Sequence, residues 1–326
     1  MNISGTRILV TGAGGHLGGH IVEQLRREDV REIIAMDRAF PTASALLEPL
    51  DDPRVTKAEC DITRKDQLHA LLKGVDGVVH SASLLSREVG TDLRNAFDVN
   101  IAGMMGLLEG CVAQGVRKVV YTSSSSVYHG HPPYTGAIAE SAGLNPASMY
   151  GVSKASGEML LRVFRTVHGL DYVALRIASI YGVRQSRRSN LARVIPETFD
   201  RVQQGLRPFV HGDGTPTYDF IDVVDVARAH VLAMKSDVTG KAYNVATGVS
   251  TAVNDLVRLI AKVGGSSLEP EYVDREGRYN IPNECLDGAT AARELGFRAE
   301  RSLRQGLEAY AAWRQDLAAR GIVLDQ

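Results

Sequence analysis

The first half of the chain alternates short apolar runs with longer segments in which apolar residues recur at helical spacing. The runs expected to form strands are 7–11, 32–37, 55–59, 77–81, 118–123 and 171–177. Between them the spacing predicts helices, such as Gly18–Arg27, where Ile21, Val22 and Leu25 share one face. Strands that are apolar throughout and alternate with helices are typical of a parallel sheet covered on both faces. The predicted fold class is therefore α/β, with a doubly wound parallel sheet of the Rossmann type.

The regular alternation ends after Tyr181. The pattern beyond it predicts helices over 191–204, 224–234, 251–263 and 302–317, and strands over 218–223 and 242–245. We therefore expect two interleaved parts rather than two consecutive domains. The sheet domain would comprise 1–178, with 218–247 returning to it. A smaller, mixed C-terminal lobe, formed by 179–217 and 248–326, would shape a substrate pocket.

Composition and charge exclude several classes of protein. Lys and Arg total 37 against 38 Asp and Glu, so the net charge of −1 gives no long-range attraction for nucleic acid or anionic membranes. The three cysteines, Cys60, Cys111 and Cys285, have neither disulfide-framework nor zinc-site spacing, and no metal is expected. No signal peptide and no uninterrupted apolar run of membrane-spanning length is apparent. These features favour a cytoplasmic protein with a small-molecule substrate.

A glycine-rich loop directly follows the first predicted strand. Gly12, Gly15 and Gly18 recur every three residues, as a tight turn and a close backbone approach to a pyrophosphate require. Asp37 closes the second strand, where a carboxylate would accept the adenosine ribose hydroxyls and repel a 2′-phosphate. The adjacent Arg38 could instead accept that phosphate. The alternative is that the three glycines form an ordinary turn without a ligand. The glycine loop followed by Asp37 favours a dinucleotide site, and the carboxylate favours NAD over NADP. The loop residues expected to contact the cofactor are Gly12, Gly15, His16, Leu17 and Gly18.

Two further segments carry groups suited to proton transfer. Tyr150 and Lys154 are four residues apart in a predicted helix, which places both on one face. An ammonium beside a phenol would lower the phenol's pKa, making Tyr150 a plausible acid and base near neutral pH. The strand within 119–128 ends in four serines at the carboxyl edge of the sheet, where such folds bind ligands. Alternatively, Tyr150 is a half-buried aromatic residue, Lys154 a solvated one and the serines cap their own backbone.

These motifs together resemble those of the extended short-chain dehydrogenases/reductases. The resemblance is to the nucleotide-sugar epimerases and dehydratases, such as UDP-galactose 4-epimerase, and it covers essentially the whole chain. Further motifs that carry it include Asp61-Ile62, His80–Ser83, Asn100, Leu175-Arg176, Asn190-Leu191 and Tyr243–Gly248. The resemblance implies that Ser124 is the catalytic hydroxyl and Tyr150 the acid and base. It also implies that Lys154 assists Tyr150 and contacts the nicotinamide ribose.

The same resemblance implies further binding residues. Asp61 and Ile62 would bracket the adenine, the segment Ser81, Ala82 and Ser83 would line the cofactor path, and Asn100 would order the site. The residues that it places toward the substrate are Ser125, Ser126, Ser179, Asn190, Leu191, Tyr218 and Arg278.

Several positions depart from the family pattern. Ser125 and Ser126 stand where the dehydratases have an Asp-Glu pair, so elimination and decarboxylation are disfavoured. Tyr218 replaces an Arg that usually pairs with phosphate, and Arg278 only approaches the second such position. Ser179 stands where sugar epimerases often have Asn. The extra His129 is interpreted as a loop insertion.

Three functions remain open on these residues. The leading one is an NAD-dependent epimerase of a nucleotide sugar, acting at C4 through a transient 4-keto intermediate. The second is an NAD-dependent dehydrogenase or reductase of a non-nucleotide alcohol or sugar, which Tyr218 favours. A regulatory dinucleotide-binding protein is the third, and the intact Ser/Tyr/Lys set argues against it.

Two predicted helices carry more apolar residues than one buried face needs. They bear 100–111, with Met104, Met105 and Leu108, and 153–164, with Met159 and Val163. One face of each must cover the sheet, which leaves the other apolar positions for a partner. We therefore expect a homodimer with two-fold symmetry.

Overall fold

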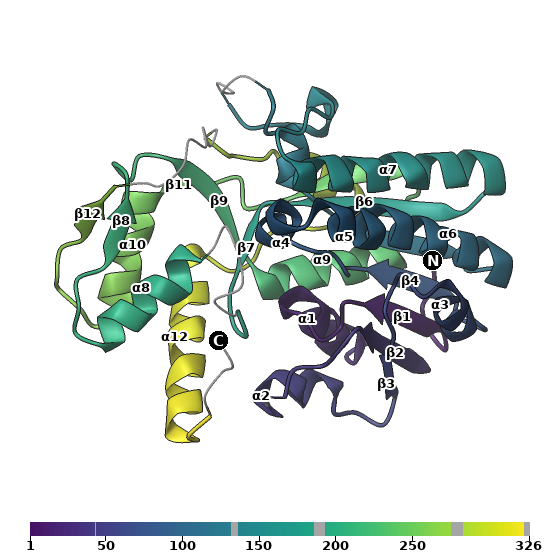
Figure 1. Cartoon of the computed structure of the whole chain (residues 1–326), viewed down its shortest axis with the longest axis horizontal. Coiled ribbons are helices and arrows are strands. Elements are labelled where there is room, and N and C mark those ends of the chain that lie inside the picture. The colour runs from purple at the N-terminus through teal and green to yellow at the C-terminus, as the bar shows by residue number, and fades with distance from the viewer. Residues whose placement is uncertain (43, 132–135, 186–192, 275–282, 323–326) are drawn as a thin grey trace.

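A seven-stranded parallel sheet forms the centre of the protein (Figure 1). The computed structural model describes residues 1–42, 44–131, 136–185, 193–274 and 283–322. The strand order is β10-β6-β5-β4-β1-β2-β3, and every neighbouring pair is parallel. Its strands are β1 (Arg7–Thr11), β2 (Glu32–Asp37), β3 (Val55–Glu59), β4 (Gly77–His80), β5 (Lys118–Ser124), β6 (Asp171–Ile177) and β10 (Lys241–Val245). The predicted doubly wound Rossmann-type sheet is confirmed.

Helices cover both faces of this sheet, as its apolar strands require. α1 (His16–Leu25) and α9 (Val223–Lys235) pack on one face, and α3 (Lys65–Leu71), α6 (Gly103–Gln114) and α7 (Met149–His168) on the other (Figure 1). Alternate strand residues enter the two separate cores: Val10 and Val120 pack toward α1 and α9, Leu9 and Val119 toward α6. The remaining helices beside the sheet are α2 (Ser44–Leu47), α4 (Ser86–Thr91), α5 (Leu93–Phe97) and α11 (Ala289–Glu294).

Among the described residues, the smaller lobe contains two short sheets and three helices around its own core. β7 (Ser179–Tyr181), β9 (Thr217–Asp222) and β11 (Ser250–Ala252) form one sheet, and β8 (Phe209–His211) and β12 (Glu271–Val273) the other. The helices are α8 (Val194–Gln203), α10 (Val253–Val263) and α12 (Leu303–Ala319). Phe199, Leu256 and Tyr310 are buried between them. The chain enters this lobe at β7 and returns to the central sheet at β10.

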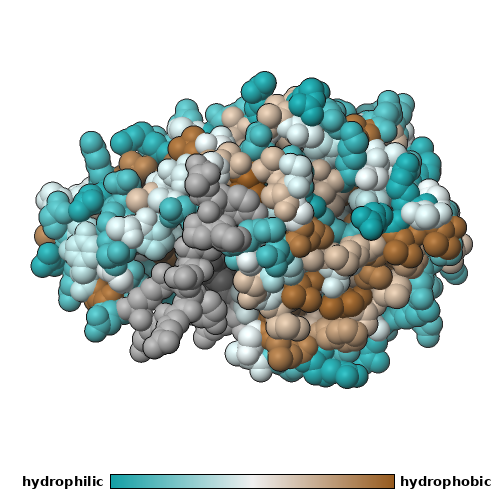
Figure 2. Space-filling view, turned by 90° about the horizontal axis from the view of Figure 1, so that it is seen from above, coloured by the Kyte–Doolittle hydropathy of each residue, from teal (hydrophilic) through white to brown (hydrophobic). Residues whose placement is uncertain are grey.

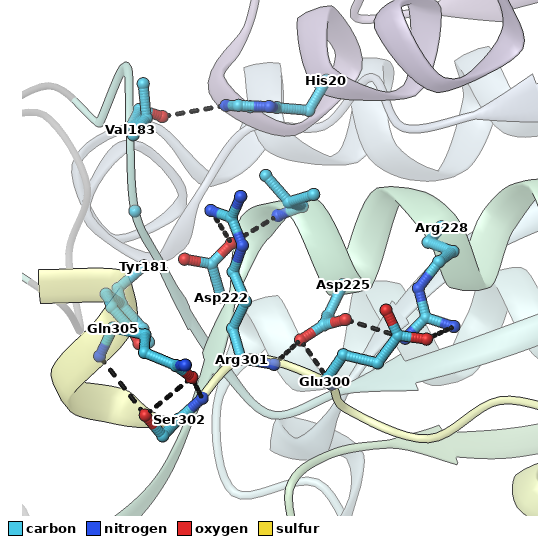
Figure 3. Close-up of polar contacts among 12 residues, drawn as sticks. His20, Tyr181, Val183, Asp222, Asp225, Arg228, Glu300, Arg301, Ser302 and Gln305 are labelled. Carbon is cyan, nitrogen blue, oxygen red and sulfur yellow. Dashed lines mark hydrogen bonds and ion pairs between the residues drawn. The ribbon is translucent and has the colours of Figure 1, made fainter. Parts of the chain in front are cut away.

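Polar contacts tie the start of α12 to the central domain (Figure 3). The buried carboxylate of Asp225 in α9 accepts hydrogen bonds from the backbone N–H groups of Glu300 and Arg301, both at 3.0 Å. The Arg301 guanidinium lies 3.6 Å from Asp222, which caps α9 through the N–H of Val224. The entry to the last helix is thus fixed on the N-terminal end of α9.

One helical stretch among the described residues, Leu93–Gln114, has the length and mean hydropathy of a membrane-spanning segment. It runs from α5 into α6 and includes Arg94, Asp98 and Glu109, so it is not an uninterrupted apolar run. Its α6 part packs on the sheet and on α3 and α7.

The helix boundary at the glycine loop differs from the expected one. α1 begins at His16 rather than Gly18, because Gly15 is extended and serves as the N-cap. Two of the three loop glycines therefore precede the helix, and Gly18 lies inside its first turn.

Candidate active site

The loop between β1 and α1 has the shape that a dinucleotide requires. Gly12 has a φ of +73°, and a Cβ there would lie 2.8 Å from the backbone nitrogen of Ala82. A Cβ at Gly18 would lie only 2.0 Å from the carbonyl oxygen of Gly12. Gly15 has no side chain with which to cap the first amides of α1, so they can bind an anion. These residues fit the pyrophosphate of a dinucleotide cofactor.

Asp37 lies at the end of β2, beside this loop. Its Oδ2 accepts the N–H of Gly14 at 2.9 Å, and its Oδ1 accepts the N–H of Arg38 at 2.7 Å. Burial raises the pKa of Asp37, while these backbone hydrogen bonds lower it. The side chain of Arg38 is exposed. The carboxylate is thus held against the glycine loop by backbone hydrogen bonds.

The end of β4 is fastened to the end of β1. The Ser81 hydroxyl donates to the carbonyl of Thr11 at 2.7 Å, and the N–H of Ala82 donates to the Thr11 hydroxyl. His80 shares that hydroxyl through Nδ1 at 2.7 Å, and Ser83 bonds the carbonyl of Leu84. This segment therefore forms the wall opposite Gly12, as a cofactor path would need.

Asp61 and Ile62 lie on the other side of β2, beyond Asp37. Asp61 accepts hydrogen bonds from the N–H and hydroxyl of Thr63, and the N–H of Cys60 bonds the carbonyl of Asp37. Ile62 is buried against the start of α6, where a Cβ at Gly103 would lie 2.9 Å from it. The geometry is compatible with an adenine pocket between the ends of β2 and β3.

Asn100 occupies a π-helical turn, Asp98–Ala102, directly before α6. Its amide bonds both backbone groups of Leu84, at 2.8 and 3.0 Å, and reaches the Ser153 hydroxyl at 3.2 Å. Such turns often occur at functional sites. Asn100 thereby links the segment after β4 to α7, one residue before Lys154.

The three expected catalytic residues meet at the carboxyl edge of the sheet. Ser124 ends β5, and its Oγ accepts hydrogen bonds from the hydroxyl of Ser126 at 2.8 Å and from the N–H of Ser126. Tyr150 lies in the first turn of α7, and its hydroxyl is close enough to Ser124 for the serine to lower the pKa of the phenol. The Nζ of Lys154 lies 5.5 Å from the centre of the Tyr150 ring. The arrangement can hold a substrate oxygen and move a proton to or from it.

The expectation that Lys154 lowers the pKa of Tyr150 is wrong. Burial raises the pKa of Tyr150 to about 12, although Ser124 opposes this rise. Burial also lowers the pKa of Lys154 to about 7, which weakens the positive charge that should act on the phenol. Local spacing correctly placed the two groups together but could not reveal how deeply both are buried.

Lys154 is held by groups that the sequence analysis did not single out. Its Nζ donates to the carbonyl of Thr122 at 3.0 Å and lies 5.3 Å from the centre of the Tyr121 ring. The Thr122 side chain bonds Nε2 of the buried His230, whose Nδ1 bonds the carbonyl of Val226. Since burial lowers the pKa of His230 to about 4, this imidazole is neutral and Thr122 donates to it.

The side chain of His16 contacts the segment after β7, where the chain enters the smaller lobe. His16 and His20 bond the same carbonyl, that of Val183, at 3.0 and 2.9 Å; Figure 3 shows the contact of His20. Burial and the Arg184 guanidinium lower the pKa of His16 to about 4 and that of His20 well below its usual value. Both rings are therefore neutral near pH 7. Only the backbone of His16 remains for the predicted cofactor contact.

The substrate-side residues lie in different environments. Ser125 and Ser126 are buried after the catalytic hydroxyl. Ser179 is buried in β7, and its hydroxyl has no hydrogen-bond partner among the described residues. The ring of Tyr218 packs against Phe220 in the core of the smaller lobe, so no cation stands at this position. Asn190, Leu191 and Arg278 lie outside the described residues.

The interpretation of His129 as a mere loop insertion is wrong. Its Nε2 lies 3.0 Å from the carboxylate of Glu284, a residue with a side chain only 2% exposed. Glu284 in turn donates its N–H to the carbonyl of Thr217 at the start of β9. His129 therefore links the segment after Ser124 to the smaller lobe. The partners are 155 residues apart in sequence, so no local pattern could have revealed the contact.

The next features are the groups that could bind a metal ion and the cysteines that could form a disulfide. Within the described ranges, no group of three or more His, Cys, Asp or Glu side chains could hold a metal ion. All three cysteines are free thiols.

Comparisons with known proteins identify the family of the chain. The sequence profile of the NAD dependent epimerase/dehydratase family matches residues 8–246. The UDP-glucose 4-epimerase of Mycolicibacterium smegmatis is 32% identical, over 92% of this chain and 96% of its own. The dTDP-glucose 4,6-dehydratase of Streptomyces antibioticus is 31% identical, over 95% and 92%. The UDP-glucose 4-epimerase structure from Thermotoga maritima superimposes with a TM-score of 0.87 at 28% identity, covering 96% of this chain and 99% of its own. The chain therefore belongs to the NAD-dependent epimerase/dehydratase family, and its cofactor is NAD.

Proposed function

We propose that this protein is an NAD-dependent epimerase that inverts C4 of a nucleotide sugar through a transient 4-keto intermediate. The observation that carries the proposal is the convergence of Ser124, Tyr150 and Lys154 beside a loop that fits NAD. Relatives from this family include both 4-epimerases and dehydratases, so the residues beside the catalytic hydroxyl must decide between them.

The chain's own residues can perform the proton transfers that C4 inversion requires. NAD, when bound, accepts a hydride from the sugar carbon and returns it. Ser124 and Tyr150 would bind the C4 oxygen, and Tyr150 would take its proton as the carbonyl forms and give it back as the alcohol is restored. Lys154 would hold positive charge near the phenol and contact the cofactor ribose. Its contact with Thr122 orients it for this role.

Elimination chemistry is disfavoured by the residues that follow Ser124. Removal of the C5 proton requires a base, and departure of the C6 hydroxyl requires an acid. The buried hydroxyls of Ser125 and Ser126 are poor at both tasks, since an unassisted serine neither gains nor loses a proton near pH 7. Hydride chemistry alone, which epimerisation uses, needs neither group.

The smaller lobe would bind the nucleotide and the inverted sugar. Ser179 supports this placement because its buried hydroxyl lacks a partner among the described residues and a substrate oxygen could satisfy it. Tyr218 favours a second candidate, a dehydrogenase or reductase of an alcohol without a diphosphate. Its ring in the apolar core cannot replace the paired donors of an arginine.

One experiment separates these candidates. Purified protein with NAD is incubated in D₂O with UDP-, dTDP-, GDP- and CDP-hexoses, and the products are followed by ¹H NMR. We expect C4 epimers that carry no solvent deuterium, because the hydride returns to the carbon it left. Accumulation of NADH with a ketone product would identify a dehydrogenase, and deuterium at C5 with loss of water would identify a dehydratase.

The variant Tyr150→Phe tests the assignment of the acid and base. Removal of the phenol hydroxyl should lower turnover by about 10² or more, with NAD affinity nearly unchanged. Ser124→Ala should lower turnover less, since Ser126 lies within hydrogen-bond distance of the same place. Tyr172→Phe, at the opposite end of the sheet, is the matched control. A Tyr150→Phe protein that retains most of its activity would contradict the mechanism.

We also propose that the protein is a homodimer. Apolar side chains gather over α6 and α7, where Figure 2 shows a hydrophobic surface above the sheet. On α7, Met159, Val163 and Val167 are 57%, 55% and 66% exposed, and on α6 Met105 is 41% exposed. The same helices bury Met104 and Leu161 against the sheet. A continuous apolar face on two adjacent helices is typical of a two-fold interface.

A cytoplasmic location is the last part of the proposal. It is supported by the three free thiols, which a reducing compartment maintains. NAD and nucleotide sugars are also small molecules that such a compartment would supply together.

A further inference from the structure

A buried carboxylate on α7 contacts the strand that carries the catalytic serine. Glu158 lies one turn after Lys154, and its Oε1 accepts a hydrogen bond from the hydroxyl of Ser123 at 2.5 Å. Arg176 of β6 donates to both oxygens of Glu158, with Nε at 3.0 Å from Oε1 and Nη2 at 2.8 Å from Oε2. The side chains of Glu158 and Arg176 are each only 8% exposed.

Arg176 also holds the segment on the far side of Ser124. Its Nη1 donates to the Tyr128 hydroxyl at 2.6 Å and to the carbonyl of Glu140 at 3.2 Å. The Tyr128 hydroxyl donates to Asn244 of β10 at 2.9 Å. The ion pair thus contacts the chain on both sides of Ser124. Glu158 contacts Ser123, the residue before it, and Arg176 contacts Tyr128 in the turn that follows.

The helix and the strand approach each other closely along this contact. A Cβ at Gly157 would lie 2.4 Å from the Tyr121 hydroxyl, and one at Gly151 would lie 2.5 Å from the carbonyl of Ser126. Apolar packing alone has little direction and tolerates a small slide of a helix along a strand. Directional side-chain contacts of α7 with β5 include those of Lys154 with Thr122 and of Glu158 with Ser123, four residues apart on one helix face. The Tyr121 hydroxyl adds a longer one, to the carbonyl of Lys154 at 3.5 Å.

Stability alone is a weak reason for a buried ion pair here. Two charges removed from water lose hydration, and apolar residues of similar volume often replace such a pair at no cost in stability. We propose that Glu158, held by Arg176, is a positioning residue that sets the register of α7 on β5. It thereby fixes the Tyr150 hydroxyl and the Lys154 ammonium relative to Ser124. This inference rests on the proposed roles of those three residues.

The test compares the Tm and kcat of two variants, one that leaves a buried charge unpaired and one that replaces the buried polar groups with apolar side chains. Glu158→Gln leaves the Arg176 charge unpaired and should lower both Tm and kcat. The triple variant Ser123→Ala/Glu158→Leu/Arg176→Met removes all three polar groups and should recover much of the Tm. Its kcat should stay at least about tenfold below wild type, since misplacement by about 1 Å can cost 10²-fold. KM should change less than threefold. Asp200→Asn, which removes a charge from the Arg314 pair in the smaller lobe, is the matched control and should leave kcat unchanged.

A single substitution and a crystal structure distinguish a positioning role from a loss of stability. Ser123→Ala alone keeps the ion pair and removes only the hydrogen bond between Glu158 and the strand, so the variant should fold and still lower kcat. A crystal structure of Ser123→Ala or of the triple variant should show the Tyr150 hydroxyl displaced relative to Ser124 from its wild-type position, whatever the substrate. Wild-type kcat in the folded variants, or an unchanged position of Tyr150 relative to Ser124, would overturn the proposal. If the wild-type protein had no epimerase activity, the proposed function would be refuted. The positions of Ser124 and Tyr150 in the variant crystal structures would still test the positioning role of Glu158.

Discussion

Lys154→Met should stabilise the cofactor-free protein near neutral pH, although it removes a residue of the active site. Burial lowers the pKa of Lys154 from 10.5 to about 7. The unfolded chain therefore binds this proton more tightly than the folded one. Between pH 7 and 10.5 the unfolded state holds more protons, so the stability of the native protein rises with pH across this window.

The size of the effect follows from these two pKa values. At 1.36 kcal/mol for each unit, the buried ammonium costs the folded state about 4 kcal/mol at pH 7 and about 2 kcal/mol at pH 9. Methionine also loses the hydrogen bond to the carbonyl of Thr122, which subtracts about 1 kcal/mol at either pH. The expected net stabilisation is about 3 kcal/mol at pH 7 and about 1 kcal/mol at pH 9.

Urea unfolding after cofactor removal measures this difference, followed by far-UV circular dichroism and by the fluorescence of Trp313, the chain's single tryptophan. Lys73→Met, at an exposed position, supplies the baseline. The decisive quantity is the change of about 2 kcal/mol between pH 7 and pH 9, because the lost hydrogen bond contributes equally at both. A free-energy difference that is the same at both pH values would refute the argument that Lys154 is desolvated.

Three other substitutions test the cofactor site and the dimer. Gly18→Ala should abolish NAD binding or folding, since its Cβ would lie 2.0 Å from the Gly12 carbonyl; fluorescence titration with NADH checks this. Wild type should bind NAD at least tenfold more tightly than NADP, or about 1.4 kcal/mol, and Asp37→Ala should narrow the gap by weakening NAD, as calorimetry would show. If the wild type bound NADP more tightly than NAD, the role of Asp37 in cofactor choice would be contradicted. Met159→Glu should convert the dimer to a monomer in light scattering, and a wild-type monomer at micromolar concentration would exclude the interface.

The sheet was predictable because its evidence is local. Most of its strands are short apolar runs, although β3 is largely polar, and the predicted limits of 7–11, 32–37, 55–59 and 171–177 coincide with β1, β2, β3 and β6. The meeting of Ser124, Tyr150 and Lys154 was predictable in part for a related reason. Tyr150 and Lys154 are one helical turn apart, and four serines end a strand at the same edge of the sheet. The family resemblance, rather than topology, singled out Ser124 among those serines.

Other features depend on distances that no local pattern contains. The depth of burial that shifts the pKa values of Tyr150 and Lys154 arises from the packing of α7 against β5. The contact between His129 and Glu284 joins segments 155 residues apart. Glu158 follows Lys154 by one turn in the sequence, yet its importance appears only when Arg176 and Ser123 are seen to meet it.

The return of the chain to the central sheet at β10 has a consequence for synthesis on the ribosome. β10 pairs with β6 through Lys241–Val245, after the chain has already built β7, α8 and β9 of the smaller lobe. A nascent chain that ends before residue 241 would leave β6 as an open edge, a template for pairing with other chains. The edge of β6 is therefore covered only after about three quarters of the polypeptide has been made. Premature termination within the smaller lobe would release an aggregation-prone fragment rather than a working cofactor domain.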